Sequence, residues 1–122
     1  MIKVLLIEDE KLLMENISLF LNNEGYHVVC AGDGEEGIRR FDALPFDIVI
    51  TDILMPRCKG DEVARHVRDS GRNIPIIAIT GSPLNFDVSC FNLVINKPFR
   101  FNDLLRCIKD TLDIGETAEK VT

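Results

Sequence analysis

Short runs of almost purely aliphatic residues alternate with longer segments of helical periodicity, and this alternation restricts the possible fold strongly. The run at residues 2–7 is apolar on both faces, which is typical of a strand covered by helices on each side. We expect five strands, at about residues 2–7, 27–31, 47–51, 75–80 and 93–95. We expect helices at about residues 11–23, 33–44, 61–70 and 102–112, where apolar side chains recur at helical spacing.

The order of these elements predicts an α/β fold. Strands that alternate with helices through short connections form βαβ units with right-handed crossovers, and therefore a parallel sheet. Asp33 and Glu36 have the spacing of a capping box at the start of one helix, and Gly25 ends another. We expect one domain at residues 1–112, followed by a polar C-terminal tail at residues 113–122 that frays.

The composition narrows the classes of partner. The 20 acidic and 14 basic residues give a net charge of −6 without any basic cluster, so we expect no direct binding to nucleic acid or to an anionic membrane. No apolar run is long enough to span a bilayer, and the first ten residues do not resemble a signal peptide. The four cysteines form no C-x-x-C pair, which favours buried thiols in a cytoplasmic protein over a zinc site or disulfides.

Five polar residues stand where four of the predicted strands end. Glu8 and Asp9 follow the first strand, Asp52 follows the third, Thr80 ends the fourth and Lys97 follows the fifth. Parallel strands present their carboxyl ends at one edge of the sheet, where ligands bind in such folds. Carboxylates that lie close together repel one another unless a cation intervenes, and Mg²⁺ suits a few carboxylates with water. Each residue alone could be a cap, a turn or a surface residue, but the ordered set predicts a site.

These residues and their neighbours resemble the receiver domains of two-component response regulators. The resemblance covers residues 3 to about 112, and its motifs are as follows: Glu8-Asp9, Asp52-Ile53-Leu54-Met55-Pro56 with Gly60, Thr80-Gly81 and Lys97-Pro98-Phe99. It implies a (βα)5 doubly wound, flavodoxin-like fold with a central five-stranded parallel sheet in the order 2-1-3-4-5.

The resemblance also implies a role for each site residue. Asp52 would accept a phosphoryl group, Lys97 would pair first with Asp52 and then with the phosphoryl oxygen, and Thr80 would hydrogen-bond the phosphoryl group. The implied ligands of Mg²⁺ are Glu8 through a water molecule, Asp9, Asp52 and the backbone carbonyl of Leu54. The protein would then be a signalling domain and not an enzyme in the usual sense, although it would catalyse its own phosphorylation and autodephosphorylation.

The implied partners are a sensor histidine kinase or a histidine phosphotransfer protein as phosphoryl donor. The output partner or effector domain is not identified by the sequence, and a homodimer is an option.

Two departures from the family pattern concern this output. The connection at residues 81–92 is short and contains Pro83 and the β-branched Val88, so we expect a shortened, irregular or absent fourth helix. Val94 stands where the family usually has a switching aromatic, so we expect an altered output surface beside an intact phosphorylation site.

Two other interpretations stay open at this point. One is a phosphate-independent, receiver-like interaction module with a vestigial acidic site. The other is a small flavin-binding or dinucleotide-binding protein, because residues 32–37 match G-x-G-x-x-G. Acidic side chains within that match, and Glu8-Asp9 in the first loop, would repel a phosphate. His27 and His66 lie far apart in sequence and are expected to be structural or surface residues.

Overall fold

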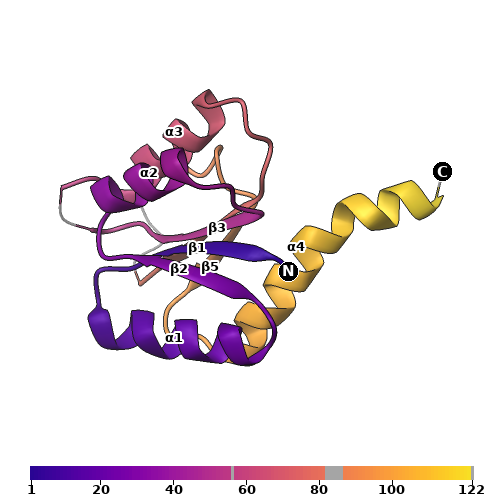
Figure 1. Ribbon diagram of the computed structural model, residues 1–122, viewed down its shortest axis with the longest axis horizontal. Coiled ribbons are helices and arrows are strands. Elements are labelled where there is room, and N and C mark those ends of the chain that lie inside the picture. The colour runs from indigo at the N-terminus through magenta and orange to yellow at the C-terminus, as the bar shows by residue number, and fades with distance from the viewer. Residues whose placement is uncertain (56, 82–86, 122) are drawn as a thin grey trace.

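The computed structural model describes residues 1–55, 57–81 and 87–121, with side chains up to residue 113. Five strands and four helices follow one another along this described chain (Figure 1). The strands are β1 (Lys3–Ile7), β2 (His27–Ala31), β3 (Ile48–Asp52), β4 (Ile76–Thr80) and β5 (Leu93–Asn96). The helices are α1 (Lys11–Asn23), α2 (Gly34–Ala43), α3 (Gly60–Asp69) and α4 (Phe101–Val121).

The five strands form one parallel sheet in the order β2-β1-β3-β4-β5, which confirms the predicted topology. Figure 1 shows α1 and the first part of α4 on one face of the sheet, with α2 and α3 on the other. Alternate residues of an inner strand therefore enter two different cores. Leu6 of β1 packs on the α1 side, whereas its neighbour Leu5 packs on the side of α2 and α3. This double burial explains why the strand sequences are aliphatic without alternation.

The described part of the connection from β4 to β5 is irregular, in agreement with the prediction. Residues 82–86, on which part of that prediction falls, lie outside the described residues, and residues 87–92 contain a turn and no helix. Arg68 of α3 holds this segment. Its guanidinium group donates to the carbonyl oxygens of Ile74 and Cys90, at 2.6 and 3.1 Å, and to Asn92 Oδ1 at 2.6 Å. Hydrogen bonds from one arginine thus help to fix residues 87–92, the described end of this connection.

Asn92→Ala is expected to lower the free energy of unfolding by about 1–2 kcal/mol. Asn92 Oδ1 accepts both from Arg68 Nη2 and from the Ile76 backbone N–H, at 2.6 and 2.8 Å, and alanine would leave both donors without this partner. Urea denaturation measures the change. Asn92→Asp keeps an acceptor oxygen at this position and should stay close to wild type. Equal stability of the alanine and aspartate variants would show that these bonds do not hold the segment.

The end of the last helix differs from the prediction. We expected a helix to about Leu112 and a frayed tail, but α4 continues to Val121, and Figure 1 shows its final turns extending away from the sheet. Polar composition alone does not end a helix, because Glu, Ala and Lys are good helix formers and a single glycine costs only about 1 kcal/mol. The domain boundary at residue 112 stays a prediction.

In the part of the chain that the structure describes, no helix has the length and apolar character needed to cross a bilayer.

Candidate functional site

The ends of the strands bring the predicted site residues together. Asp52 and Thr80 are the last residues of β3 and β4, and Lys97 directly follows β5. The ladder continues past the strand ends, because the Ile53 N–H donates to the Ile79 carbonyl oxygen at 3.1 Å and the Lys97 N–H to the Thr80 carbonyl oxygen at 2.7 Å. This register aligns the ends of three neighbouring strands at one edge of the sheet.

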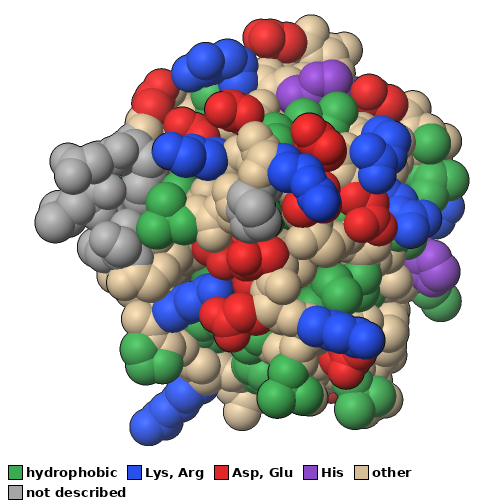
Figure 2. All heavy atoms as spheres, turned by 90° about the vertical axis from the view of Figure 1, so that its left-hand side faces the viewer, with side chains coloured by type: hydrophobic (Ala, Val, Ile, Leu, Met, Phe, Trp, Pro, Cys, Tyr) green, Lys and Arg blue, Asp and Glu red, His purple; other side chains and the backbone are tan. Residues whose placement is uncertain are grey.

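Three carboxylates gather at this edge. Glu8, Asp9 and Asp52 each offer an oxygen atom, and these atoms all lie within 4.8 Å of one another. Glu8 is 1% exposed and Asp52 is 5% exposed, whereas Asp9 faces solvent. Figure 2 looks onto the side of the molecule that is on the left in Figure 1 and shows acidic side chains gathered near its middle, with basic side chains beside them. Such packing of like charges destabilises a protein unless a cation is shared.

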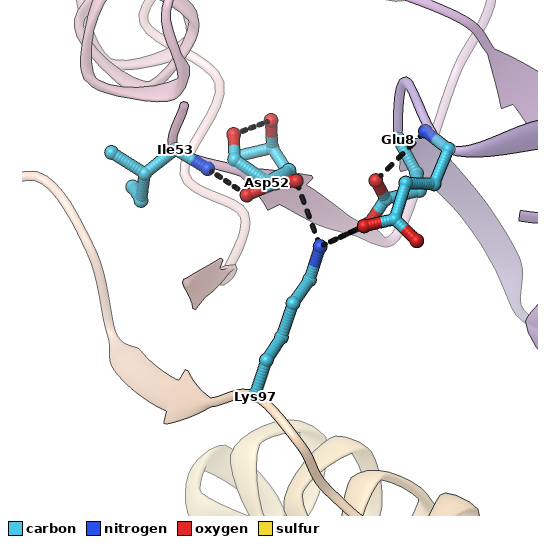
Figure 3. Close-up of polar contacts among 6 residues, drawn as sticks. Glu8, Asp52, Ile53 and Lys97 are labelled. Atoms are coloured by element: carbon cyan, nitrogen blue, oxygen red, sulfur yellow. Dashed lines mark hydrogen bonds and ion pairs between the residues drawn. The ribbon is translucent and has the colours of Figure 1, made fainter. Parts of the chain in front are cut away.

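Lys97 supplies positive charge at this cluster. Its Nζ lies 2.9 Å from Asp52 Oδ2 and 3.2 Å from Glu8 Oε1, and Figure 3 shows the side chain reaching from the end of β5 toward both carboxylates. A third carboxylate, from the mostly exposed Glu10, has its Oε1 3.7 Å from the same nitrogen. The sequence interpretation did not include Glu10. The run of acids at residues 8–10 was the available signal, but only the side-chain geometry shows that the third acid reaches Lys97.

The protonation of the site follows from burial and charge. Burial raises the pKa of Glu8 to about 7, while the hydrogen bond from the Glu10 N–H opposes the increase and the charge of Asp52 adds to it. Burial alone would lower the pKa of Lys97, but the hydrogen bond and charge of Asp52, together with the charge of Glu8, raise it overall. Lys97 is therefore a fixed cation at neutral pH, whereas Glu8 is partly protonated in the absence of any other cation.

The donor set fits a hard divalent cation. The buried Glu8 Oε1 lies near Lys97 but accepts no well-formed hydrogen bond from the described residues. One amino group cannot satisfy the lone pairs of three converging carboxylates, and oxygen ligands of this kind are those that Mg²⁺ prefers. The structure thus provides an all-oxygen donor set with one buried oxygen that is incompletely paired.

Asp52, the candidate nucleophile, is held in position by hydrogen bonds with its neighbours in the chain. Asp52 Oδ1 accepts from the Ile53 N–H at 2.7 Å, and the Thr51 hydroxyl donates to the Asp52 carbonyl oxygen at 2.9 Å. Gly60, at the start of α3, passes so close behind Asp52 that an added Cβ would lie 2.2 Å from the Asp52 carbonyl oxygen. Only glycine fits there without a shift of backbone. These supports fix the orientation of the carboxylate before any ligand binds.

Thr80 and Leu54 are the remaining predicted site residues, and Val94 is the predicted departure on β5. Thr80 is fully buried at the end of β4. Leu54, two residues after Asp52, has a side chain that is 56% exposed, and its predicted role as a metal ligand through the backbone carbonyl stays a prediction. Val94 is partly buried on β5, beside Ala78 of β4.

The residues expected to stand outside the site do so. His66 lies at the surface and pairs with Asp42, with 2.7 Å between His66 Nε2 and Asp42 Oδ1, and His27 is exposed on β2. All four cysteines are free thiols. In the G-x-G-x-x-G segment, Asp33 caps α2 by accepting from the Glu36 N–H at 2.8 Å, so a carboxylate occupies the helix N-terminus that a pyrophosphate would need.

Comparison with known proteins identifies a family for this chain. The family model for the response regulator receiver domain matches residues 4–109. Response regulator RR06 of Streptococcus pneumoniae is 38% identical over 77 residues, which cover 63% of this chain and 35% of that protein. The transcriptional regulatory protein DltR of Streptococcus agalactiae is 35% identical over 112 residues, which cover 88% of this chain and 50% of that protein. The chain therefore spans half or less of the length of these relatives.

A solved structure gives the same result at the level of the fold. The response regulator TrrA from Thermotoga maritima, crystallised in complex with Mg²⁺-BeF, superposes with a TM-score of 0.85 at 30% identity over 91% of this chain and 99% of that one. This chain belongs to the response regulator receiver domain family.

Proposed function

We propose that Asp52 accepts a phosphoryl group in a Mg²⁺-dependent reaction and that this modification switches a signalling surface. The observation that carries the proposal is the convergence of Glu8, Asp9 and Asp52 within 4.8 Å, with Lys97 Nζ 2.9 Å from the Asp52 carboxylate. Phosphoryl transfer needs positioned charge more than covalent chemistry from the protein, and the site offers such charge. The domain would catalyse its own phosphorylation and autodephosphorylation.

Each site residue has a different proposed role in the phosphoryl transfer. One Asp52 oxygen would attack phosphorus and form an acyl phosphate, while the bond from phosphorus to the donor's leaving group breaks. The Lys97 ammonium group would leave the Asp52 carboxylate and pair with a phosphoryl oxygen. The Thr80 hydroxyl would donate a hydrogen bond to a second phosphoryl oxygen. The proposed ligands of Mg²⁺ are Glu8 through a water molecule, Asp9, Asp52 and the Leu54 carbonyl. When bound, Mg²⁺ would neutralise charge on the phosphoryl oxygens, and the Mg²⁺-BeF complex of TrrA supports its inclusion.

The proposed partners are those that membership of the receiver domain family implies. The proposed donor is a histidine kinase or a histidine phosphotransfer protein, and the output partner or effector domain stays unidentified. Homodimerisation is a further option for the output. Four free thiols suit a reducing compartment, which supports a cytoplasmic location.

The proposal predicts one acyl phosphate per chain. Purified protein is incubated with acetyl phosphate or phosphoramidate, with Mg²⁺ or with EDTA, and its intact mass is measured. We expect a single phosphoryl adduct with Mg²⁺ and little or none with EDTA. Borohydride reduction converts an aspartyl phosphate to homoserine, and peptide mapping should then find the change at Asp52. No adduct under any condition would instead favour a phosphate-independent interaction module.

A further inference from the structure

Glu10 is a third carboxylate at Lys97, and the proposed reaction gives it no role. Its Oε1 lies 3.7 Å from the lysine Nζ, compared with 2.9 Å for Asp52 Oδ2 and 3.2 Å for Glu8 Oε1. The Glu10 side chain is 66% exposed, whereas that of Glu8 is 1% exposed. Glu10 is also not a member of the group of three carboxylates whose oxygen atoms could share a cation. It therefore contacts the lysine from the exposed rim of the site.

The backbone of Glu10 is held, but its side chain does not cap a helix. The Glu10 N–H donates to Glu8 Oε2 at 3.1 Å, and its carbonyl oxygen accepts from the Met14 N–H at 2.9 Å. Glu10 occupies the N-cap position of α1, where a side-chain oxygen commonly accepts from the first N–H groups of the helix. The Glu10 carboxylate makes no such bond and reaches Lys97 instead.

A cavity beside the pair gives the Glu10 side chain room to move. Its volume is about 390 Å³, and it is lined by Glu10, Leu13, Lys97, Pro98 and Phe99. Because the main chain is held and the side chain is mostly exposed, the carboxylate can leave Lys97 by rotation of the side chain alone. An exposed ion pair of this length also contributes little stability. Of the three contacts of Lys97 with carboxylates, the contact with Glu10 is therefore the easiest to exchange for another anion.

Binding of a cation would change the balance of charge at Lys97. Mg²⁺ would share the charges of Glu8 and Asp52, whereas the charge of Glu10 would stay with the ammonium group. A phosphoryl oxygen must then compete with Glu10 for that group. We propose that Glu10 restrains the phosphorylation of Asp52 by holding Lys97 away from the phosphoryl oxygen, which makes Glu10 a positioning residue. This inference rests on the proposed function, because it assumes that Lys97 pairs with the phosphoryl group.

Glu10→Asp separates this contact from a general effect of charge. Aspartate keeps the negative charge, but its side chain is shorter by a methylene group and favours capping of α1, so it should not reach Lys97. If Glu10 acts through its contact with Lys97, Glu10→Asp and Glu10→Gln both speed phosphorylation. If Glu10 only repels an anionic phosphoryl donor at a distance, Glu10→Gln speeds the reaction and Glu10→Asp does not.

The test is the initial rate of adduct formation, followed by intact mass for the full chain with phosphoramidate, saturating Mg²⁺ and constant ionic strength. The variants are Glu10→Gln, Glu10→Asp, Lys97→Met, and Glu10→Gln combined with Lys97→Met. Glu15→Gln removes an exposed carboxylate of α1 and is the matched control for the change in net charge. Thermal unfolding in EDTA checks that all variants fold.

We expect Glu10→Gln and Glu10→Asp to react about two- to fivefold faster than wild type, in keeping with the loss of an exposed pair, and Glu15→Gln to match wild type. In the Lys97→Met background, Glu10→Gln should have no further effect, because the shared contact is already lost. The inference is wrong if Glu10→Gln is no faster than wild type, if Glu10→Asp keeps the wild-type rate, or if the acceleration persists without Lys97. In each of these cases the adduct itself would still support the proposed function. A wild-type chain that forms no adduct would overturn the proposed function, and the inference with it.

Discussion

Asp52→Asn is expected to eliminate the phosphoryl adduct and to leave the fold intact. An amide oxygen is a far poorer nucleophile than a carboxylate, so no acyl phosphate should form at this position. In the wild-type protein the Ile53 N–H donates to Asp52 Oδ1 at 2.7 Å. Asparagine has the same shape as aspartate and keeps an oxygen atom that can accept this hydrogen bond. Intact mass after treatment with phosphoramidate and Mg²⁺ measures the adduct, and circular dichroism measures the fold.

Asp42→Asn is the matched control, because Asp42 is an exposed carboxylate that pairs with His66 away from the cluster. This variant should form the adduct at the wild-type rate. The Asp52 charge contributes to the raised pKa of Glu8, so Asp52→Asn should also lower that pKa from about 7 when no metal is present, which carboxyl NMR can follow. An adduct of full yield in Asp52→Asn would contradict the assignment and direct attention to Asp9.

The sheet could be predicted because its determinants are local. The aliphatic runs at β1, β3 and β4 are buried on both faces, and only a strand between two helical layers requires such a pattern. The carboxyl ends of parallel strands then share one edge whatever the details of packing. Asp52 and Thr80 could be placed there from the sequence for this reason, without knowledge of any side-chain conformation.

The side-chain contacts away from this edge of the sheet depend on backbone and side-chain conformations that cannot be derived from the sequence. The pairing of Arg57 with Asp33 joins residues from different loops. Arg57 also has a left-handed backbone, which sequence rules associate with glycine or asparagine. In the same way, Pro83 and Val88 argued against a regular helix between β4 and β5. They did not indicate that Arg68 and Asn92 would anchor the described part of this connection.

The arrangement of charge suggests why the site suits a switch. Without a metal, the two buried carboxylates share Lys97, and one Glu8 oxygen stays incompletely paired. Added positive charge would relieve the repulsion between these carboxylates, so the binding of a cation would stabilise the folded protein. If Asp52 is phosphorylated as proposed, its contact with Lys97 would have to be redistributed. The lysine is thus a second point at which the proposal can be tested.

Lys97→Met is expected to slow adduct formation about 100-fold or more while Mg²⁺ still binds. The loss of a preorganised donor aimed at developing charge commonly has effects of this size. Methionine has a similar length but carries no charge, so the Asp52 carboxylate would lose its 2.9 Å partner and the phosphoryl oxygens would lose one cation. The rate is measured by intact mass over time with phosphoramidate at saturating Mg²⁺.

Binding of Mg²⁺ separates this role of Lys97 from a general loss of structure. Lys97 competes with the metal for the charge of Glu8 and Asp52, so its removal should leave Mg²⁺ affinity equal to wild type or greater. Lys11→Met, which removes an exposed lysine at the start of α1, should change neither the rate nor the affinity. If Lys97→Met lost Mg²⁺ binding and phosphorylation together, its ammonium group would be a support for the carboxylates and not a participant in transfer. A slow rate with intact or tighter Mg²⁺ binding assigns the ammonium group to the phosphoryl oxygens.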